Sequence, residues 1–113
     1  MAFNKIKAIT IFGFADCPPE TPLYKEAMEV ARLLAENGLE IVNGGGPGVM
    51  RAATEGAHEG GGIATVATFY PKFIENFEGK DDHNKADKEI IMNNYIDRTM
   101  KLLELGNAYV IFN

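Results

Sequence analysis

Short apolar, β-branched runs alternate along this chain with longer segments in which apolar residues recur at helical spacing. Runs of the first kind predict buried strands, and segments of the second kind predict amphipathic helices. The predicted strands are residues 7–14, 38–42, 63–67, 89–92 and 107–112, and the predicted helices are residues 23–37, 49–59 and 97–105. Alternation of strands and helices is typical of βαβ units. We therefore expect one Rossmann-like α/β domain over residues 1–113, with a parallel sheet and helices on both faces.

Sequence signals mark both ends of the first predicted helix. Apolar residues also recur at helical spacing in the first and the last predicted helices. Three prolines (Pro18, Pro19 and Pro22) exclude an earlier start, and Asn37-Gly38 is a typical C-terminal cap. The residues at helical spacing are Tyr24, Ala27, Ala31 and Leu34 in the first helix and Ile96, Met100 and Leu103 in the last. These faces are expected to follow the 3.6-residue period.

The most informative segment is the glycine-rich turn Gly44-Gly45-Gly46-Pro47-Gly48 between a predicted strand and a predicted helix. Glycines let the backbone turn sharply and approach a ligand without Cβ obstruction. The first turn of the following helix leaves N–H groups unpaired and carries a partial positive charge. The turn therefore predicts a phosphate site, and a nucleotide is the expected ligand. The alternative is a tight strand-to-helix connection with no ligand.

Composition and charge narrow the class of protein. The chain has 113 residues, a net charge of −5 and one cysteine, Cys17. An acidic chain argues against a general nucleic-acid binder, although backbone amides can still form a local anion pocket. A single cysteine forms no internal disulfide, and neither a membrane-spanning run nor a signal peptide is evident. These features predict a soluble, cytoplasmic protein without a membrane partner.

A series of segments resembles one known family. These are Ile9-Thr10-Ile11-Phe12-Gly13, Pro22-Leu23-Tyr24, Leu34-Ala35-Glu36-Asn37-Gly38, the run from Gly44 to Met50, and Tyr95-Ile96-Asp97-Arg98-Thr99-Met100 with the strand after it. Together they resemble the LOG family, the cytokinin riboside 5′-monophosphate phosphoribohydrolases often labelled lysine-decarboxylase-like. The similarity covers nearly the whole chain.

The resemblance implies a Rossmann-like fold that binds a nucleoside 5′-monophosphate and hydrolyses its N-glycosidic bond, giving free base and ribose 5-phosphate. It implies no redox cofactor and a homo-oligomer, as a dimer. Arg98 matches the family's active-site arginine, a fork-shaped donor for ribose or phosphate oxygens. The positions that match the nucleotide-binding segments are Gly13, Gly45, Gly46, Gly48, Val49 and Met50.

The chain departs from the family pattern at three places. Family members continue after the last strand into Pro-Gly-Gly-x-Gly-Thr-x-x-Glu, whose glutamate is catalytic, and the given sequence ends at Asn113 where that proline would stand. The chain is thus expected to be the N-terminal portion of a LOG-type fold. Phe14 stands where the family commonly has serine, and Arg51 stands where it often has glutamate. Arg51 would either add positive charge near an anion or be a surface residue.

Several other residues invite a chemical role that their pattern does not support. The group Asp81, Asp82, His83 and Asp87 lacks diagnostic metal-ligand spacing and is expected to form, with Lys80, a solvated charged loop. Asp16 suits either the ligand crevice or a turn, and Arg98 on helix pattern alone is an exposed arginine. His58 suits a helix C-terminus, Cys17 lacks a paired histidine, and no spacing singles out Glu75, Glu78 or Glu89 as a replacement carboxylate.

Three functions are therefore compared. The first is a phosphoribohydrolase of which this chain holds the nucleotide-binding half. The second is a non-catalytic nucleotide- or phosphate-binding module that kept the glycine turn and lost the carboxylate. The third is a truncated assembly piece, which an exposed sheet edge would favour.

Overall fold

Five parallel strands form a single sheet in the computed structural model, which describes residues 6–70 and 81–113. The strands are β1 (Ala8–Gly13), β2 (Glu40–Asn43), β3 (Ala64–Thr68), β4 (Lys88–Ile91) and β5 (Ala108–Phe112), and their order across the sheet is β4-β3-β2-β1-β5. The register pairs Ile9 with Ile41 and with Ala108 across the two neighbours of β1. Strands β2, β3 and β4 are thus added one after another on one side of β1, and β5 pairs with the other side of β1.

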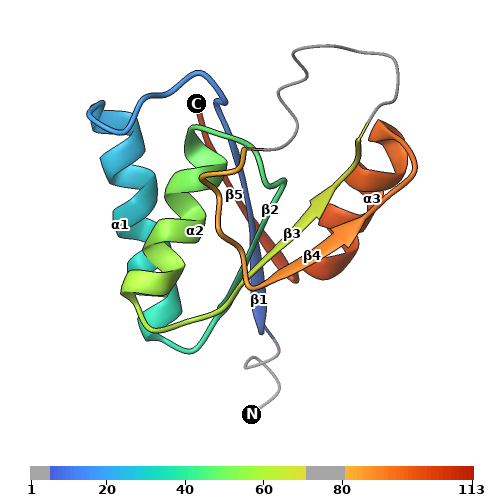
Figure 1. Cartoon of the computed structure of the whole chain (residues 1–113). Helices are drawn as coiled ribbons and strands as arrows, with labels where there is room; N and C mark the ends of the chain where they lie inside the picture. The colour runs from blue at the N-terminus through green and yellow to red at the C-terminus, as the bar shows by residue number, and fades with distance from the viewer. Residues whose placement is uncertain (1–5, 71–80) are drawn as a thin grey trace.

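Three helices cover the two faces of the sheet unequally (Figure 1). Helices α1 (Pro22–Glu36) and α2 (Val49–Glu59) pack against each other on one face, and α3 (Tyr95–Leu105) lies on the other. The fold is therefore the expected Rossmann-like α/β arrangement with helices on both faces. No helix of residues 6–70 and 81–113 is long and apolar enough to cross a membrane.

The larger hydrophobic core lies between the sheet and the α1–α2 pair. Alternate residues of β1 point to opposite faces, so Ile9 and Ile11 join this core while Ala8 and Phe12 join the smaller one under α3. Small side chains allow the two helices to approach closely: a Cβ atom on Gly56 would lie 2.2 Å from the carbonyl oxygen of Met28. Burial of both sheet faces explains the nearly continuous apolar runs of the strands.

The predicted elements all occur, with shifts of one or two residues at most of their ends. Residues 49–59 begin and end as expected, because Gly48 caps the helix start and Gly60 its end. The first helix begins at Pro22 and not after it, since Thr21 provides the N-terminal cap and proline suits the first helical position. The last helix begins at Tyr95, two residues early, because Asn94 caps it. Gly38, with φ of 84°, follows the Asn37 cap as predicted.

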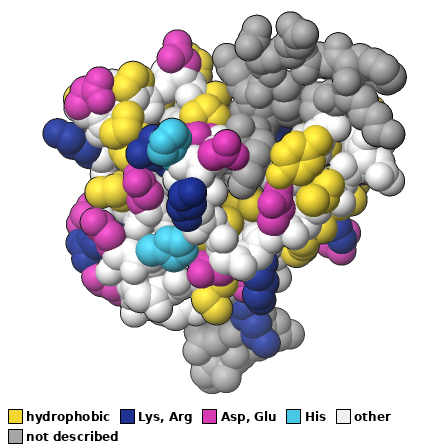
Figure 2. All heavy atoms as spheres, in the orientation of Figure 1, with side chains coloured by type: hydrophobic (Ala, Val, Ile, Leu, Met, Phe, Trp, Pro, Cys, Tyr) yellow, Lys and Arg dark blue, Asp and Glu magenta, His cyan; other side chains and the backbone are white. Residues whose placement is uncertain are grey.

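The apolar face of α3 is exposed, contrary to what an amphipathic pattern suggests. Ile96 is 74% exposed and Met100 60%, whereas the buried residues of this helix are Arg98 and Leu102. Figure 2 shows hydrophobic side chains at the surface over β4 and α3. Ile96, Met100 and Leu103 do share one face of the helix at helical spacing, as predicted. The face that packs on the sheet is instead the one that carries Arg98 and Leu102.

The strand order determines where a ligand crevice opens. Strands β2, β3 and β4 lie on one side of β1 and β5 lies on the other, so the strand order reverses between β1 and β5. In open α/β sheets, ligands bind at the carboxyl ends of the strands at such a point. Gly13 ends β1 there, and a Cβ atom on it would lie 2.9 Å from the carbonyl oxygen of Phe112, at the end of β5. The glycine turn after β2 lies at the same edge.

Candidate functional site

Two cavities flank the glycine turn at the carboxyl edge of the sheet. The first, of about 340 Å³, lies on the α3 side and is lined by Ile11, Phe12, Gly13, Gly44, Met50, Tyr95, Arg98, Thr99 and Leu102. The second, of about 300 Å³, lies on the α1 side and is lined by Ala15, Asp16, Cys17, Pro18, Pro19, Tyr24, Pro47, Gly48 and Arg51. The turn therefore borders both cavities.

The shape of the turn requires glycine at two positions. Gly45 has φ of 77° and Gly48 has φ of 67°, in the left-handed region that other residues rarely adopt. Gly48 also lies against the loop after β1, because a Cβ atom on it would come within 2.2 Å of the carbonyl oxygen of Phe14. That same oxygen accepts a hydrogen bond from the Val49 N–H at 2.9 Å. The turn is thus packed directly on the end of β1.

The N-terminus of α2 carries an unbalanced positive dipole. Its cap residue, Gly48, has no side chain to accept from the helix, and its first turn contains no acidic residue. Within the part of the chain that the structure describes, the N–H groups of Met50 and Arg51 have no acceptor. Unpaired N–H groups at a helix start favour an anion nearby.

Arg98 enters the first cavity from α3 and is only 6% exposed. The Asn94 side chain caps the helix by accepting from the Asp97 N–H at 2.8 Å, which fixes the first turn below Arg98. The Arg98 Nε donates to the Ala67 carbonyl at 3.0 Å, and its Nη2 donates to the Gly44 carbonyl at 2.9 Å. Arg98 therefore ties α3 both to the end of β3 and to the start of the glycine turn.

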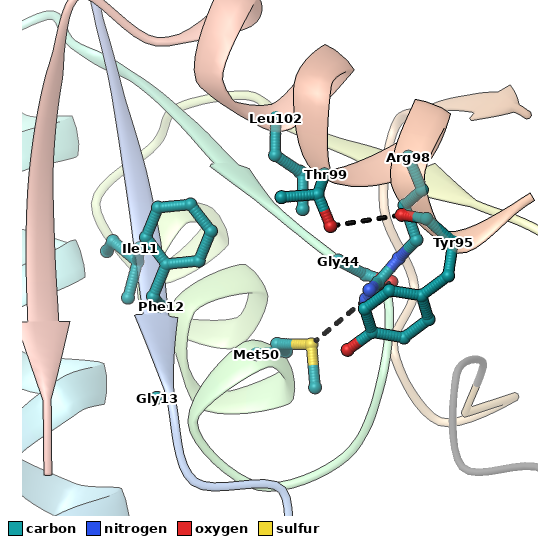
Figure 3. A pocket seen from close by; sticks show the side chains of 9 residues that line it. All are labelled: Ile11, Phe12, Gly13, Gly44, Met50, Tyr95, Arg98, Thr99 and Leu102. Carbon is teal, nitrogen blue, oxygen red and sulfur yellow. Dashed lines mark hydrogen bonds between the residues drawn. The ribbon is translucent and has the colours of Figure 1, made fainter.

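The guanidinium of Arg98 faces neutral groups (Figure 3). Its Nη2 lies 3.7 Å from the Met50 sulfur, and its carbon lies 5.3 Å from the centre of the Tyr95 ring. Among residues 6–70 and 81–113, no carboxylate oxygen lies within ion-pair distance of this group, and Nη1 has no hydrogen-bond partner. A buried cation without a counter-charge is costly, which favours an anionic ligand beside Nη1.

Arg51 is the cation of the second cavity, and it has a carboxylate neighbour. Its Nε lies 3.7 Å from Glu55 Oε2, while Glu55 Oε1 accepts a hydrogen bond from the Tyr24 hydroxyl. Burial, followed by the hydrogen bond to Glu55, raises the pKa of Tyr24 above its ordinary value, so the phenol stays protonated at neutral pH. Asp16 lines this cavity as well. The charges of the second cavity are therefore mixed, unlike those of the first.

The residues expected to bind phosphate do not all lie in one place. Gly13, Met50 and Arg98 line the first cavity, whereas Gly48 lines the second. Two further predicted residues face the protein interior: Val49 is fully buried and packs on Gly13, and a Cβ atom on Gly45 would lie 2.7 Å from Thr68. Gly46 contributes its carbonyl to a hydrogen bond from Asn84 at 3.0 Å. The expectation that Arg98 on pattern alone is exposed was wrong, because its side chain reaches the strand ends.

The other chemically reactive side chains form local pairs. Asp81 Oδ1 lies 3.2 Å from His83 Nδ1, and Asp87 Oδ2 lies 2.8 Å from His58 Nε2. In the described ranges no three His, Cys, Asp or Glu side chains come together as metal ligands would. The buried Cys17 thiol lies 3.2 Å from the Thr21 hydroxyl.

The carboxylates considered as replacements for the family's glutamate are not found in the first cavity. Glu89 accepts hydrogen bonds from the hydroxyls of Thr68 and Tyr70 beside β4. Glu75 and Glu78, like Lys80 of the predicted charged loop, lie outside the described residues. Phe14, at the position where the family has serine, is 59% exposed.

Sequence reasoning missed part of the cavity wall. Tyr95 and Thr99 line it, together with Gly44, which belongs to the predicted turn but was not singled out as a site residue. Asn43 and Asn84 form hydrogen bonds to the turn. Tyr95 and Thr99 stand next to Arg98 on the same helix, so helical spacing contained a signal for them. Asn84 had none, because the segment that carries it is far from the turn in sequence.

Two solved structures with a similar fold are cofactor proteins. The molybdenum cofactor carrier protein from Chlamydomonas reinhardtii is 24% identical, with a TM-score of 0.71 over 96% of this chain and 63% of that one. The molybdenum cofactor binding protein from Rippkaea orientalis is 20% identical, with a TM-score of 0.73 over 96% of this chain and 63% of that one. At these identities the similarity concerns the fold, and this chain spans less than two thirds of either structure.

Similarity in sequence to one relative and to one family covers a little more than half of the chain. An uncharacterized protein from Archaeoglobus fulgidus is 41% identical over 62 residues, which cover 55% of this chain and 40% of that protein. A profile of the SLOG cluster4 family matches residues 6–71, a range that contains β1, the glycine turn and β3. The chain belongs to the SLOG cluster4 family.

Proposed function

We propose that this chain binds a nucleoside 5′-monophosphate in the first cavity, with the phosphate beside Arg98. The observation that carries the proposal is that Arg98, a residue only 6% exposed, has no carboxylate partner among the described residues. The unpaired N–H groups at the start of α2 add to the positive potential at the same edge. Phe12 and Tyr95 give the cavity aromatic walls that suit a planar base.

Binding without hydrolysis is the form of this function that the lining residues support best. Hydrolysis of the N-glycosidic bond develops positive charge at the glycosidic carbon, so a carboxylate near that carbon is needed. The nine residues that line the first cavity include no Asp or Glu. The carrier and binding proteins with a similar fold are named for holding a cofactor, which agrees with a binding role.

The phosphoribohydrolase activity that the LOG resemblance implies is the second candidate. It is favoured by Arg98, which by the resemblance matches the family's active-site arginine, and it requires a carboxylate other than the nine residues that line the first cavity. Release of adenine from AMP, followed by chromatography, tests this activity. Adenine that appears with the wild-type protein and disappears with Arg98→Met would support hydrolysis. Binding of AMP without adenine would restrict the function to ligand binding.

The binding proposal is tested by titrating AMP and adenosine into three proteins by calorimetry: wild type, Arg98→Met and Arg51→Met. Loss of a charge-assisted hydrogen bond costs about 1.5–3 kcal/mol, so Arg98→Met should weaken AMP about 10- to 100-fold. The affinity for adenosine, which lacks the phosphate, should fall far less. Arg51→Met makes the same change on the other side of the turn and should keep most of the AMP affinity. A larger loss with Arg51→Met would place the phosphate in the second cavity and overturn the proposal.

We also propose that the chain forms a homo-oligomer in which α3 faces a second copy. The family resemblance motivates a dimer, and the exposed side chains of Ile96, Met100 and Leu103 supply an apolar stripe along this helix. Exposed apolar patches often mark protein–protein contacts.

A further inference from the structure

Three consecutive carbonyl groups of the glycine turn each accept a hydrogen bond from a later part of the chain. The Gly44 carbonyl accepts from Arg98 Nη2 at 2.9 Å. The Gly45 carbonyl accepts from the Asp81 N–H at 2.9 Å, and the Gly46 carbonyl accepts from Asn84 Nδ2 at 3.0 Å. The directions of the Gly44, Gly45 and Gly46 carbonyls are thereby fixed from outside the turn.

The orientation of the Asn84 amide follows from its partners. The Gly45 N–H donates to Asn43 Oδ1 at 2.8 Å, so the Asn43 oxygen faces the turn while its Nδ2 donates to the Thr54 hydroxyl at 2.8 Å. Asn84 therefore meets two acceptors, the Gly46 carbonyl at 3.0 Å and Asn43 Oδ1 at 3.2 Å, and only its NH₂ group satisfies both. Asn43 is fully buried and Asn84 is 1% exposed, so water does not replace these bonds.

The two asparagines perform different tasks in this network. Asn43 is the last residue of β2, and its Oδ1 accepts a hydrogen bond from the Gly45 N–H of the turn. Asn84 ends a tight turn closed by its own N–H, which donates to the Asp81 carbonyl at 2.9 Å. The same short segment thus provides both donors for the Gly45 and Gly46 carbonyls. Loss of the Asn84 side chain removes one of these donors and loosens the attachment of the other.

We propose that Asn84 is a positioning residue for anion binding at the glycine turn. This inference rests on the proposed function. A carbonyl oxygen carries partial negative charge, so a carbonyl that rotates toward a bound phosphate repels it, while an N–H group attracts it. By holding the Gly46 carbonyl, Asn84 keeps this oxygen from rotating toward a bound phosphate, and it does so without contacting the ligand, because it does not line the first cavity.

The test compares Asn84→Leu with Thr54→Val. The first variant keeps a side chain of similar size and removes the donor to the Gly46 carbonyl. The second removes the acceptor of Asn43 Nδ2 in the same buried network and leaves both bonds of Asn84 in place. Both leave a buried polar group unpaired, so both should lower the melting temperature, and Thr54→Val is the matched control for lost stability.

Calorimetric titration with AMP and with adenosine provides the functional readout. We expect Asn84→Leu to lower the affinity for AMP about tenfold relative to Thr54→Val. The affinity for adenosine should fall by less than about threefold, because adenosine lacks the phosphate that a displaced carbonyl oxygen would repel. Equal AMP affinity in the two variants, or equal losses for AMP and adenosine, would overturn the positioning role while leaving AMP binding intact. Failure of the wild-type protein to bind AMP would instead reject the proposed function, and this inference with it.

Amide hydrogen exchange without ligand provides a second readout. The Asp81 N–H is protected by the Gly45 carbonyl and the Gly45 N–H by Asn43. Asn84→Leu should accelerate exchange of the Asp81 N–H about tenfold or more relative to Thr54→Val, since the segment loses its anchor. Unchanged Asp81 exchange in Asn84→Leu would show that Asn84 does not hold the turn and would overturn the inference.

Discussion

Gly44 leaves the space that the guanidinium of Arg98 occupies. An ideal Cβ atom on Gly44 would lie 1.9 Å from Arg98 Nη2 and 2.9 Å from the Met50 sulfur. The Gly44 carbonyl is at the same time an acceptor for that nitrogen. The first glycine of the turn is therefore needed for the position of the arginine, independently of any contact between the turn and a ligand.

The substitution Gly44→Ala should displace Arg98 and weaken AMP binding. The added methyl group forces the guanidinium away from the Gly44 carbonyl, and overpacking of this kind typically costs about 1–3 kcal/mol of stability. We expect at least about a tenfold loss of AMP affinity together with a lower melting temperature. Calorimetry and thermal unfolding measure the two effects.

Gly61→Ala is the control for Gly44→Ala. Gly61 has φ of 75° but nothing within 4 Å of an added Cβ atom, so alanine there strains the backbone far from the cavity. It should lower the melting temperature and keep AMP affinity. If Gly44→Ala bound AMP as well as Gly61→Ala does, the close approach of Gly44 and Arg98 would be irrelevant to the ligand.

Gly56→Ala should destabilise the fold although alanine is the better helix former. Helix propensity favours alanine by about 1 kcal/mol. At Gly56, however, the added Cβ atom would lie 2.2 Å from the Met28 carbonyl and 2.8 Å from the Ala31 side chain, so α1 and α2 must separate. We expect a net loss of about 1–3 kcal/mol in the free energy of unfolding, measured with urea. Glu59→Ala, at an exposed position of the same helix, should change it by less than about 0.5 kcal/mol.

Asp87 should make stability depend on pH in the acidic range. The Ala64 N–H, followed by His58, holds the pKa of the Asp87 carboxyl below its ordinary value. A lowered pKa in the folded state means that the carboxylate stabilises the protein above the unfolded pKa of about 4. This contribution is lost as the pH falls through the folded pKa. Because 45% of the side chain is exposed, we expect it to be no more than about 1 kcal/mol.

Thermal unfolding of wild type and Asp87→Asn from about pH 3 to pH 7 measures this contribution. The wild-type protein should have the higher melting temperature near pH 7, and the difference should shrink below about pH 4. Asp82→Asn, at an exposed position of the same segment, is the control and should follow the wild type. A difference between wild type and Asp87→Asn that is constant with pH would mean that the charge of Asp87 is not involved.

The fold was predictable to the extent that its determinants are local. Periodicity and the glycine caps defined α2 at both ends, and the five apolar runs became five parallel strands. In α3, periodicity identified an apolar face but not which face packs on the sheet. The buried residues of α3 are Arg98 and Leu102. Arg98 is buried because the neighbouring strand ends present carbonyl groups to which its guanidinium donates hydrogen bonds.

The candidate site was predictable only in part for a related reason. Gly13, Met50 and Arg98 were singled out and line one cavity, since the resemblance includes all three segments. The separation of Gly48 into the second cavity and the role of Asn84 depend on contacts between segments distant in sequence. Such contacts leave no periodic signal in a single sequence.

Met100→Lys tests whether the exposed stripe of α3 faces a second copy. Met100 lies between Ile96 and Leu103 at helical spacing and is 60% exposed, so lysine there should change the stability of a monomer by less than about 0.5 kcal/mol. In a dimer that buries the stripe, two opposed lysines near the symmetry axis would repel each other and lose apolar contact. We expect light scattering to give a dimer mass for the wild type and a monomer mass for Met100→Lys. Ile63→Lys, a similar change at a 46% exposed residue before β3, should remain dimeric. A monomeric wild type, or a dimer that Met100→Lys leaves intact, would contradict an interface through α3.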